Sequence, residues 1–216
     1  MKKTVFSAAL ALLLSACVGE AAKDVGGEEK VPVVAVAGNS IADFWINYDS
    51  TFFATEGYID FAVSGETSRQ VLRRFPNSVL KARPDVVVIV SPHTNDVAAN
   101  EGPVTDEQMI ANLDSMIMLS RAAGAIPVVT ANLPSNYFFW RTEMRPGEDI
   151  IRVNGKIKAM ADSLGVAYVD LHTPLAAAGG AFAEKYTLDG AHPNSAGYAV
   201  MGPLVKAAVD SVLSVR

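Results

Sequence analysis

Four short polar segments of the sequence bring together a nucleophile, a base, an acid and hydrogen-bond donors. They are residues 38–40 (GNS), 64–67 (SGET), 92–96 (PHTND) and 189–193 (DGAHP). A serine hydroxyl is an effective nucleophile only when a neighbouring base takes its proton, and that base works better when a carboxylate orients it. Ser40, His192 and Asp189 have the side chains for these roles. The short separation of Asp189 and His192 lets one turn present both side chains to the same cleft.

The same segments offer donors for a negatively charged oxygen. Attack of a nucleophile on a carbonyl group produces an oxyanion, which needs hydrogen-bond donors aimed at it. The candidates are the backbone N–H of Gly65, the side-chain amide of Asn95 and the backbone N–H of Ser40. Gly65 suits this role because a missing side chain lets the backbone approach a substrate closely.

Alternating strands and helices must position these segments. Near-continuous apolar runs, such as VVVIV at 86–90, are typical of a parallel sheet covered on both faces. We therefore expect an α/β fold, a three-layer α/β/α sandwich with about five parallel strands, whose following loops open on one ligand-binding edge. The expected strands are residues 31–37, 58–63, 85–91, 126–131 and 166–171.

Three longer segments predict helices. Thr105 and Gln108 form a capping box, after which Met109, Leu113 and Met116 fall on one helical face until Gly124. The other two predicted helices are residues 149–164 and 195–213.

The amino-terminal segment is typical of a signal that targets a protein to the bacterial envelope. Residues 1–16 combine two lysines with a short apolar run, as a secretory signal does, and Cys17 follows directly. This pattern resembles a bacterial lipoprotein signal, in which Cys17 carries the lipid and residues 17–30 tether a domain spanning 31–216. We expect a lipid-anchored protein of a Gram-negative envelope, and Val18 favours the outer membrane. The alternative is an ordinary cleaved signal with an incidental cysteine.

Composition excludes several classes of protein. The 216 residues are 50% hydrophobic, which suffices for one domain with a full core. The net charge is −5 and no cluster of basic residues occurs, so the sequence lacks the Lys and Arg contacts to phosphate that nucleic-acid binding usually needs. One cysteine and three histidines argue against a disulfide framework and against a metal site.

In their order and spacing, Ser40, Gly65, Asn95 and His192 resemble the four sequence blocks of the SGNH (GDSL-type) hydrolase superfamily. The resemblance runs from about residue 33 to residue 205. It implies a flavodoxin-like fold, no metal or organic cofactor, and hydrolysis of esters or thioesters through an acyl-serine intermediate. Two positions depart from the pattern: Asn39 replaces the usual Asp, and His93 replaces the usual Gly beside the oxyanion donors. We expect Asn39 to preserve activity, whereas His93 can narrow the pocket, contact substrate or displace Asn95.

Several candidate residues have a second interpretation. Ser40 can simply cap the helix that follows it. Asp189 and His192 can form an Asx turn with a surface histidine, and a backbone carbonyl can orient a catalytic histidine in place of Asp189. We expect Asp96 to bind loop backbone amides and His172 to have a structural role.

Aromatic residues bear on the substrate. Phe44 and Trp45 follow Ser40 by about one helical turn, and residues 137–141 (YFFWR) occupy the long loop after the fourth predicted strand. The rings of this loop either pack back on the domain or form a pocket wall that stacks on a sugar or lines an acyl groove. The candidate pocket residues are His93, Trp45, Phe139, Trp140 and Arg141.

The combined hypothesis is a serine esterase that hydrolyses short acyl esters, such as O-acetyl groups on a carbohydrate. Its partners are then a small-molecule or glycan ester and a lipid bilayer, without nucleic acid. Two alternatives remain open: a lysophospholipase or thioesterase for longer acyl chains, and a binding protein that keeps the fold without catalysis. An α/β-hydrolase is disfavoured because residues 38–42 lack the second glycine of its nucleophile turn.

Overall fold

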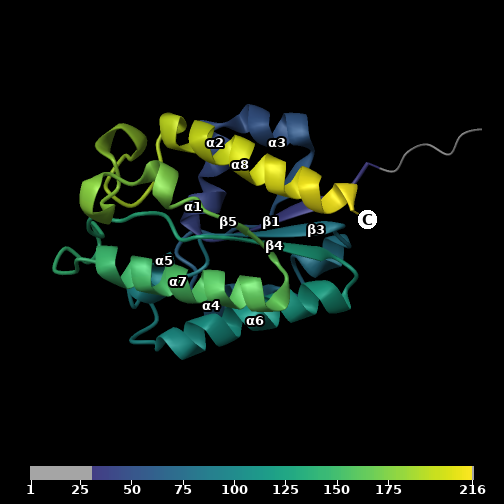
Figure 1. Cartoon of the computed structure of the whole chain (residues 1–216), viewed down its shortest axis with the longest axis horizontal. Helices are drawn as coiled ribbons and strands as arrows, with labels where there is room; N and C mark the ends of the chain where they lie inside the picture. Colours follow the sequence, from purple (N-terminus) through teal and green to yellow (C-terminus); the bar gives the residue numbers. More distant parts are fainter. Residues whose placement is uncertain (1–30, 216) are drawn as a thin grey trace, which may run out of the picture. The chain divides into compact units, whose positions relative to one another are not determined.

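The computed structural model describes residues 31–215, and its centre is a five-stranded parallel sheet (Figure 1). The sheet order is β2-β1-β3-β4-β5. Each strand lies within or directly beside one of the predicted runs, so the predicted α/β class with five parallel strands is confirmed. The strands are β1 (Val34–Gly38), β2 (Tyr58–Asp60), β3 (Val86–Val90), β4 (Ile126–Thr130) and β5 (Ala167–Val169).

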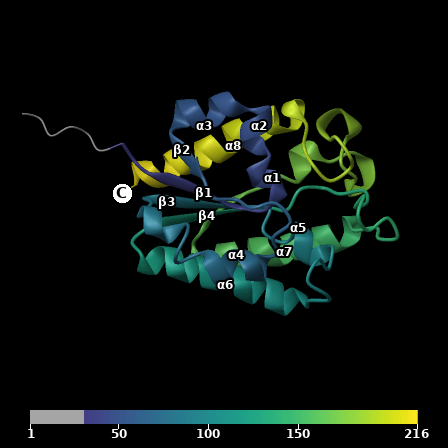
Figure 2. The same ribbon diagram turned by 180° about the vertical axis from the view of Figure 1, so that it is seen from behind.

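Helices cover both faces of the sheet (Figures 1 and 2). Helices α1, α2, α3 and α8 lie on one face, and α4, α6 and α7 on the other. The α-helices are α1 (Ser40–Asp43), α2 (Trp45–Tyr48), α3 (Ser50–Glu56), α4 (Ser68–Arg74), α5 (Thr94–Val97), α6 (Asp106–Ala122), α7 (Gly147–Leu164) and α8 (Ser195–Ser214). Short 3₁₀ turns occur at Leu80–Ala82, Thr173–Leu175, Ala178–Gly180 and Glu184–Tyr186.

The alternation of side chains along the strands divides the core into two apolar clusters. In β3, Val87 and Ile89 pack toward α4, α6 and α7, whereas Val86 and Val88 pack toward α1, α3 and α8. Successive side chains of a strand point to opposite faces, so strands covered on both sides need apolar residues at every position. This requirement explains the unbroken VVVIV sequence of β3, all of which is buried.

The predicted helices are confirmed with small shifts at their ends. Thr105 caps α6 through the predicted capping box with Gln108, and Gly124 adopts φ +81° after its end. Helix α8 is apolar and long enough to cross a membrane by length and composition alone. Its buried residues, among them Tyr198 and Met201, pack on the sheet, so a core role accounts for its apolar character.

The chain reverses its winding between β1 and β3, because β2 and β3 lie on opposite sides of β1. Ligands of open α/β sheets bind at such a point, beside the carboxyl ends of the strands. Ser40 begins α1, separated from the end of β1 by one residue, and α5 with Asn95 follows β3. The predicted signal peptide, Cys17 and the tether at 17–30 lie outside the described residues, so they stay predictions.

Candidate active site

Ser40 lies in the turn between β1 and α1, and the backbone on the β1 side of this turn packs closely against β3. It is the first residue of α1, and the side chain of Asn39 caps this helix by accepting a hydrogen bond from the Ile41 N–H at 3.1 Å. A Cβ atom at Gly38 would lie 2.8 Å from the Val90 carbonyl oxygen of β3, so only glycine permits this approach. From α8, the Tyr198 hydroxyl donates to the Ile41 carbonyl at 2.9 Å.

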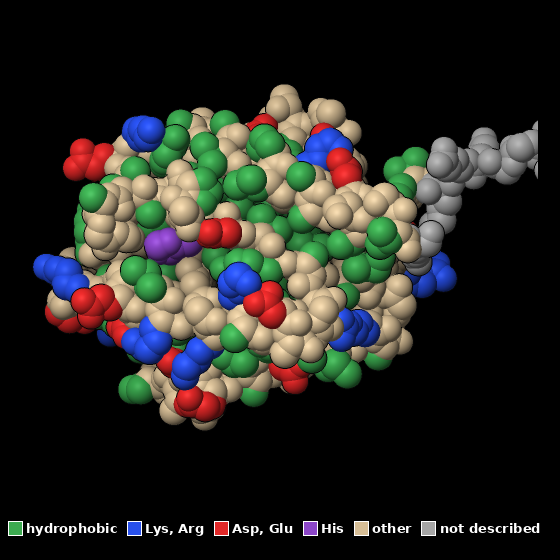
Figure 3. All heavy atoms as spheres, viewed as in Figure 1, with side chains coloured by type: hydrophobic (Ala, Val, Ile, Leu, Met, Phe, Trp, Pro, Cys, Tyr) green, Lys and Arg blue, Asp and Glu red, His purple; other side chains and the backbone are tan. Residues whose placement is uncertain are grey.

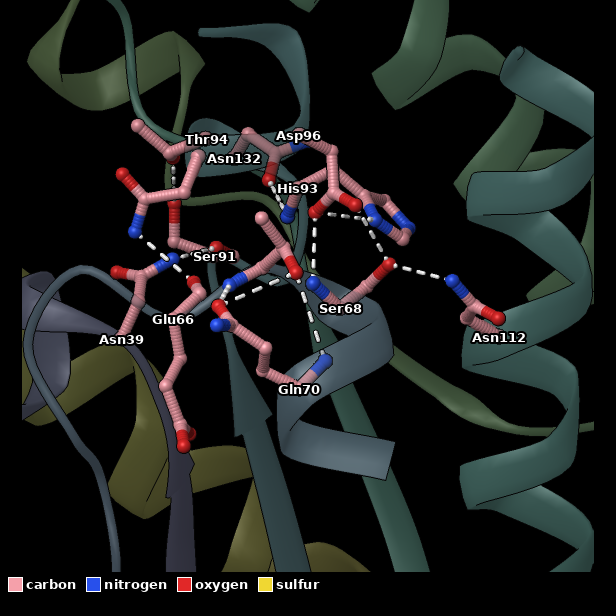
Figure 4. A network of polar contacts seen from close by, with 12 residues as sticks. Asn39, Glu66, Ser68, Gln70, Ser91, His93, Thr94, Asp96, Asn112 and Asn132 are labelled. Carbon is pink, nitrogen blue, oxygen red and sulfur yellow. Dashed lines mark hydrogen bonds and ion pairs between the residues drawn. The ribbon is translucent and has the colours of Figure 1, made fainter. Parts of the chain in front are cut away.

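Asn39 has a second contact that an aspartate could not make. Its Nδ2 donates to the Ser91 carbonyl at 2.9 Å, and the residue is buried. Ser91 itself has a φ of +44°, which is unusual for a residue other than glycine. The amide of Asn39 therefore connects the turn that contains Ser40, after β1, to the loop after β3 (Figure 4). This contact explains why asparagine, in place of the usual aspartate, fits at position 39.

We expect Asn39→Asp to lower stability by about 1–3 kcal/mol at neutral pH, because its carboxylate would face the Ser91 carbonyl without a donor between them. At acidic pH a protonated carboxyl group can donate as the amide does, so the deficit should shrink. Urea unfolding of both proteins at pH 4.5 and pH 8 measures the difference. An equal deficit at both values would contradict the assigned role of the Asn39 amide.

The structure brings Ser40, His192 and Asp189 together in one hydrogen-bonded chain. Ser40 Oγ lies 2.9 Å from His192 Nε2, and His192 Nδ1 lies 2.8 Å from Asp189 Oδ2. A carboxylate only accepts hydrogen bonds, so the proton of a neutral His192 belongs on Nδ1, and Nε2 is left to accept the Ser40 hydroxyl proton. This is the arrangement that activates a serine.

Asp189 is held by its own turn as well as by the histidine ring. Its Oδ1 accepts the backbone N–H groups of Ala191 at 3.0 Å and His192 at 2.8 Å. Burial raises the pKa of Asp189, but the hydrogen bonds from the side chain and backbone of His192 and from Ala191 outweigh it and hold the pKa below its ordinary value. The carboxylate therefore stays ionised wherever His192 must be neutral. Asp189 does form the Asx turn that the alternative interpretation expected. This turn orients the Asp189 carboxylate toward the His192 ring.

Gly65 and Asn95 lie beside Ser40 and line the same pocket. Gly65 has a φ of +81°, a conformation that L side chains rarely adopt. The Asn95 Nδ2 donates one hydrogen to the Glu66 carbonyl at 2.9 Å, so its second hydrogen is available to an oxyanion. Asn95 is almost fully buried, at 2% exposure. Two of the donor residues expected from the sequence thus lie beside Ser40.

Asp96 connects the segment that contains Asn95 to the segment that follows Gly65. Its Oδ2 accepts the Ser68 backbone N–H and its Oδ1 accepts the Ser68 hydroxyl, each at 2.8 Å (Figure 4). Asn112 of α6 donates to the same hydroxyl at 2.9 Å. Asp96 thus binds the first residue of α4, as expected, and does not act as a second acid in the pocket.

The expectation that His93 contacts the pocket is wrong. The residue is fully buried behind α5, and the pocket wall does not include it. Its Nδ1 lies 3.7 Å from Asp96 Oδ2, and its backbone N–H donates to Asn132 Oδ1 at 2.7 Å (Figure 4). The side chain turns inward because the chain bends from β3 into α5 at this residue. Asn95 keeps its place beside Ser40.

The pocket beside Ser40 has a volume of about 350 Å³ and a largely aromatic rim. Three rings surround His192: Phe44 at 5.3 Å, Trp140 at 6.0 Å and Phe139 at 6.2 Å between ring centroids. Phe139 is 57% exposed, so its ring forms an open edge. The pocket-wall interpretation therefore holds for Phe139 and Trp140, whereas Phe138 is buried in the domain core.

Trp45 and Arg141, which were predicted to line the pocket, lie outside it. Trp45 is fully buried in the core and stacks on Phe52 at 4.7 Å and on Tyr198 at 5.6 Å between ring centroids. Arg141 is exposed, and its guanidinium donates to the Ala99 carbonyl at 3.4 Å outside the pocket. Phe44, which was named beside Trp45 in the sequence analysis but was left out of the candidate pocket residues, lines the pocket, and so does Asn100. Asn100 carried no sequence signal, because it lies outside the four motifs.

The remaining histidine, His172, lies away from the pocket. Within residues 31–215, no group of three or more His, Cys, Asp or Glu side chains is arranged to hold a metal ion. The backbone N–H of His172 donates to Asp170 Oδ1 at 2.9 Å, and burial lowers the pKa of its ring. His172 thus lies in a turn after β5 and not in the pocket.

Comparison with known proteins now decides the family. The model of the GDSL-like lipase/acylhydrolase family matches residues 36–200. The chain belongs to this family. The resemblance expected from the four motifs is therefore confirmed, and the protein is a carboxylic-ester hydrolase by family. A search of curated proteins finds no match.

Solved structures agree with this assignment. A GDSL-like lipase from Bacteroides thetaiotaomicron is 34% identical, with a TM-score of 0.83, and the match covers 86% of this chain and 91% of that one. A protein from Bacteroides fragilis, provisionally named an acylhydrolase, is 33% identical over 86% and 90% of the two chains, with a TM-score of 0.83. An acetylxylan esterase from Geobacillus stearothermophilus shares the fold at 16% identity, with a TM-score of 0.62 over 82% and 94% of the chains.

Proposed function

We propose that this GDSL-family protein is a serine esterase that removes short acyl groups, such as O-acetyl groups on a carbohydrate, through an acyl-serine intermediate. The observation that carries the proposal is the continuous chain from Ser40 Oγ through the His192 ring to the Asp189 carboxylate, with contacts of 2.9 and 2.8 Å. Such a chain supplies a nucleophile, a general base and a fixed tautomer.

In the first half of the reaction, His192 Nε2 accepts the Ser40 proton while Ser40 Oγ attacks the ester carbonyl carbon. The carbonyl oxygen becomes an oxyanion, which the Gly65 and Ser40 backbone N–H groups and the free hydrogen of the Asn95 amide stabilise. His192 then gives its proton to the leaving alcohol oxygen, the carbon–oxygen bond to the alcohol breaks, and the acyl group stays on Ser40.

The second half repeats the same steps with water. His192 takes a proton from a water molecule, whose oxygen attacks the acyl carbon, and the same donors hold the second oxyanion. The proton returns to Ser40 Oγ as its bond to the acyl carbon breaks, and the carboxylic acid leaves. Asp189 stabilises the positive imidazolium in both halves without accepting its proton.

The walls of the pocket favour a neutral ester with a small acyl group. Its volume of about 350 Å³ lies at the small end of the range for ligand pockets. No Lys or Arg side chain of residues 31–215 lines it, so within this part of the chain an anionic headgroup finds no cationic partner. The leaving alcohol must lie next to His192, where Phe44, Phe139 and Trp140 surround the ring. Aromatic faces at this position suit the apolar face of a sugar.

A series of p-nitrophenyl esters from acetate to palmitate, given to residues 18–216, tests the substrate proposal. We expect the highest kcat/KM with acetate and a steady fall with chain length, because a small pocket leaves a long chain exposed to water. A maximum with long chains would contradict the short-acyl proposal and favour a lysophospholipase or thioesterase. Equal rates across the series would show that the pocket walls do not select the acyl group.

We also propose that Cys17 anchors this enzyme to the bacterial envelope, with the outer membrane as the favoured site. The support is the sequence of residues 1–17, with its basic start, apolar run and single cysteine. Acidic and basic side chains alternate on the face shown in Figure 3, which carries no large patch of one charge.

A further inference from the structure

The oxyanion donor Asn95 is connected to the aromatic wall by one intervening side chain, Asn100. Its Nδ2 donates to Asn95 Oδ1 at 3.0 Å, and its Oδ1 accepts the indole N–H of Trp140 at 2.9 Å. The backbone N–H of Asn100 also donates to the Asn95 carbonyl at 3.0 Å. All three residues lie on the described part of the pocket wall. We infer that Asn100, itself fixed by Trp140, is a positioning residue that holds the Asn95 amide in its oxyanion-binding orientation.

The orientation of an asparagine amide depends on its partners, because its oxygen and nitrogen ends are similar in size and shape. With Asn100 donating to its oxygen, Asn95 must present its NH₂ group to the Glu66 carbonyl and to the pocket. If the amide turned over, its oxygen would face the Glu66 carbonyl and the site of the developing negative charge. A donor on Oδ1 is therefore as necessary as the amide itself.

Asn100 can do this because its own loop is anchored from two sides. The neighbouring Glu101 accepts a hydrogen bond from the Thr67 hydroxyl at 2.6 Å and pairs with Arg69 at 3.1 Å. On the other side, Arg141 donates to the Ala99 carbonyl at 3.4 Å, next to the contact between Trp140 and Asn100. The loop between α5 and α6 is thereby tied both to the segment after Gly65 and to the aromatic wall.

The Asn100 side chain acts both as a donor and as an acceptor, and different substitutions separate the two roles. Its Nδ2 donates to Asn95 Oδ1 and, at 3.5 Å, to the Gly65 carbonyl, whereas its Oδ1 accepts from Trp140. Asn100→Asp keeps the size and the acceptor for Trp140 but replaces the donor to Asn95 with an oxygen. Trp140→Phe keeps an aromatic ring in the wall but removes the N–H that fixes Asn100. Asn100→Ala removes all three side-chain contacts without adding charge.

The inference rests on the proposed serine mechanism and is tested by steady-state kinetics on p-nitrophenyl acetate. Removal of an oxyanion donor lowers kcat about 10²- to 10³-fold, so a displaced donor should cost less. We expect Asn100→Asp to lower kcat by roughly 10- to 100-fold with KM changed less than about threefold. Trp140→Phe should lower kcat by roughly 3- to 10-fold, as the loss of one supporting hydrogen bond would. Asn77→Asp, on an exposed residue, is the matched control and should keep the kcat of the unmodified enzyme.

A double-mutant cycle distinguishes positioning from general loosening of the loop. If Trp140 acts through Asn100, Trp140→Phe should not lower kcat further in the Asn100→Ala background. Unchanged kcat in Asn100→Asp, or equal Trp140→Phe effects in both backgrounds, would overturn the inference. Ser40→Ala, measured in the same assay, distinguishes failure of the positioning role from failure of the serine mechanism. Inactive Ser40→Ala would uphold the serine mechanism on which the inference rests, whereas full activity would overturn both the mechanism and the role of Asn100.

Discussion

Ser40→Ala is expected to lower kcat for p-nitrophenyl acetate by about 10⁴- to 10⁶-fold, because Ser40 has the only hydroxyl group among the described residues that line the pocket. KM should change little, since the walls around Phe44 and Trp140 are intact. Steady-state hydrolysis at saturating substrate measures the effect. The lost hydroxyl makes one hydrogen bond, to His192, so the thermal midpoint should stay close to that of the unmodified protein.

Ser163→Ala is the matched control, because Ser163 is an exposed serine of α7 whose hydroxyl donates to the Met160 carbonyl within the same helix. It should keep full activity. If Ser40→Ala folded normally and kept more than a few per cent of the activity, Ser40 would not be the nucleophile.

Asp189→Asn is the second change with a large expected effect, a loss of about 10²- to 10⁴-fold in kcat. The asparagine can keep the contacts of Oδ1 with Ala191 and His192 backbone N–H groups, so the turn should persist. Its NH₂ group, however, would face His192 Nδ1 and move the ring proton to Nε2, which then cannot accept the Ser40 proton.

The loss in Asp189→Asn should be present at every pH above about 4, because hydrogen bonds hold the Asp189 pKa below its ordinary value and the carboxylate is ionised throughout that range. Rate profiles of both proteins against pH provide the measurement. Asp162→Asn, on the exposed surface of α7, serves as the control and should have no effect. A loss below fivefold in Asp189→Asn would mean that a backbone carbonyl orients His192 instead.

The fold was predictable because its strands are buried on both faces. Such strands need apolar residues at successive positions, as in β3, and their ends are marked by the polar motifs that follow. The positions of Ser40, Gly65 and Asn95 were also predictable, because each lies in the segment that follows β1, β2 or β3. Asp189 and His192 were predictable from their place just before the last helix, α8. Sheet topology then brings them together without further information from the sequence.

The pocket walls were predictable only in part, because neighbouring positions on a helical turn face different directions. Phe44 and Trp45 are adjacent in sequence, yet Phe44 faces His192 while Trp45 turns about 100° away into the core. His93 was misplaced because the direction of its side chain depends on the bend between β3 and α5. Asn100 could not be found at all, since its role comes from the three-dimensional contact with Trp140.

The most direct test of the serine mechanism is to treat residues 18–216 with a fluorophosphonate and locate the adduct by peptide mass spectrometry. We expect one stoichiometric adduct on Ser40, formed slowly or not at all in Asp189→Asn and absent from Ser40→Ala. Absence of an adduct together with absence of ester hydrolysis would favour a binding protein that keeps the fold without the chemistry. An adduct on another serine, with hydrolysis intact in Ser40→Ala, would contradict the assignment of the nucleophile.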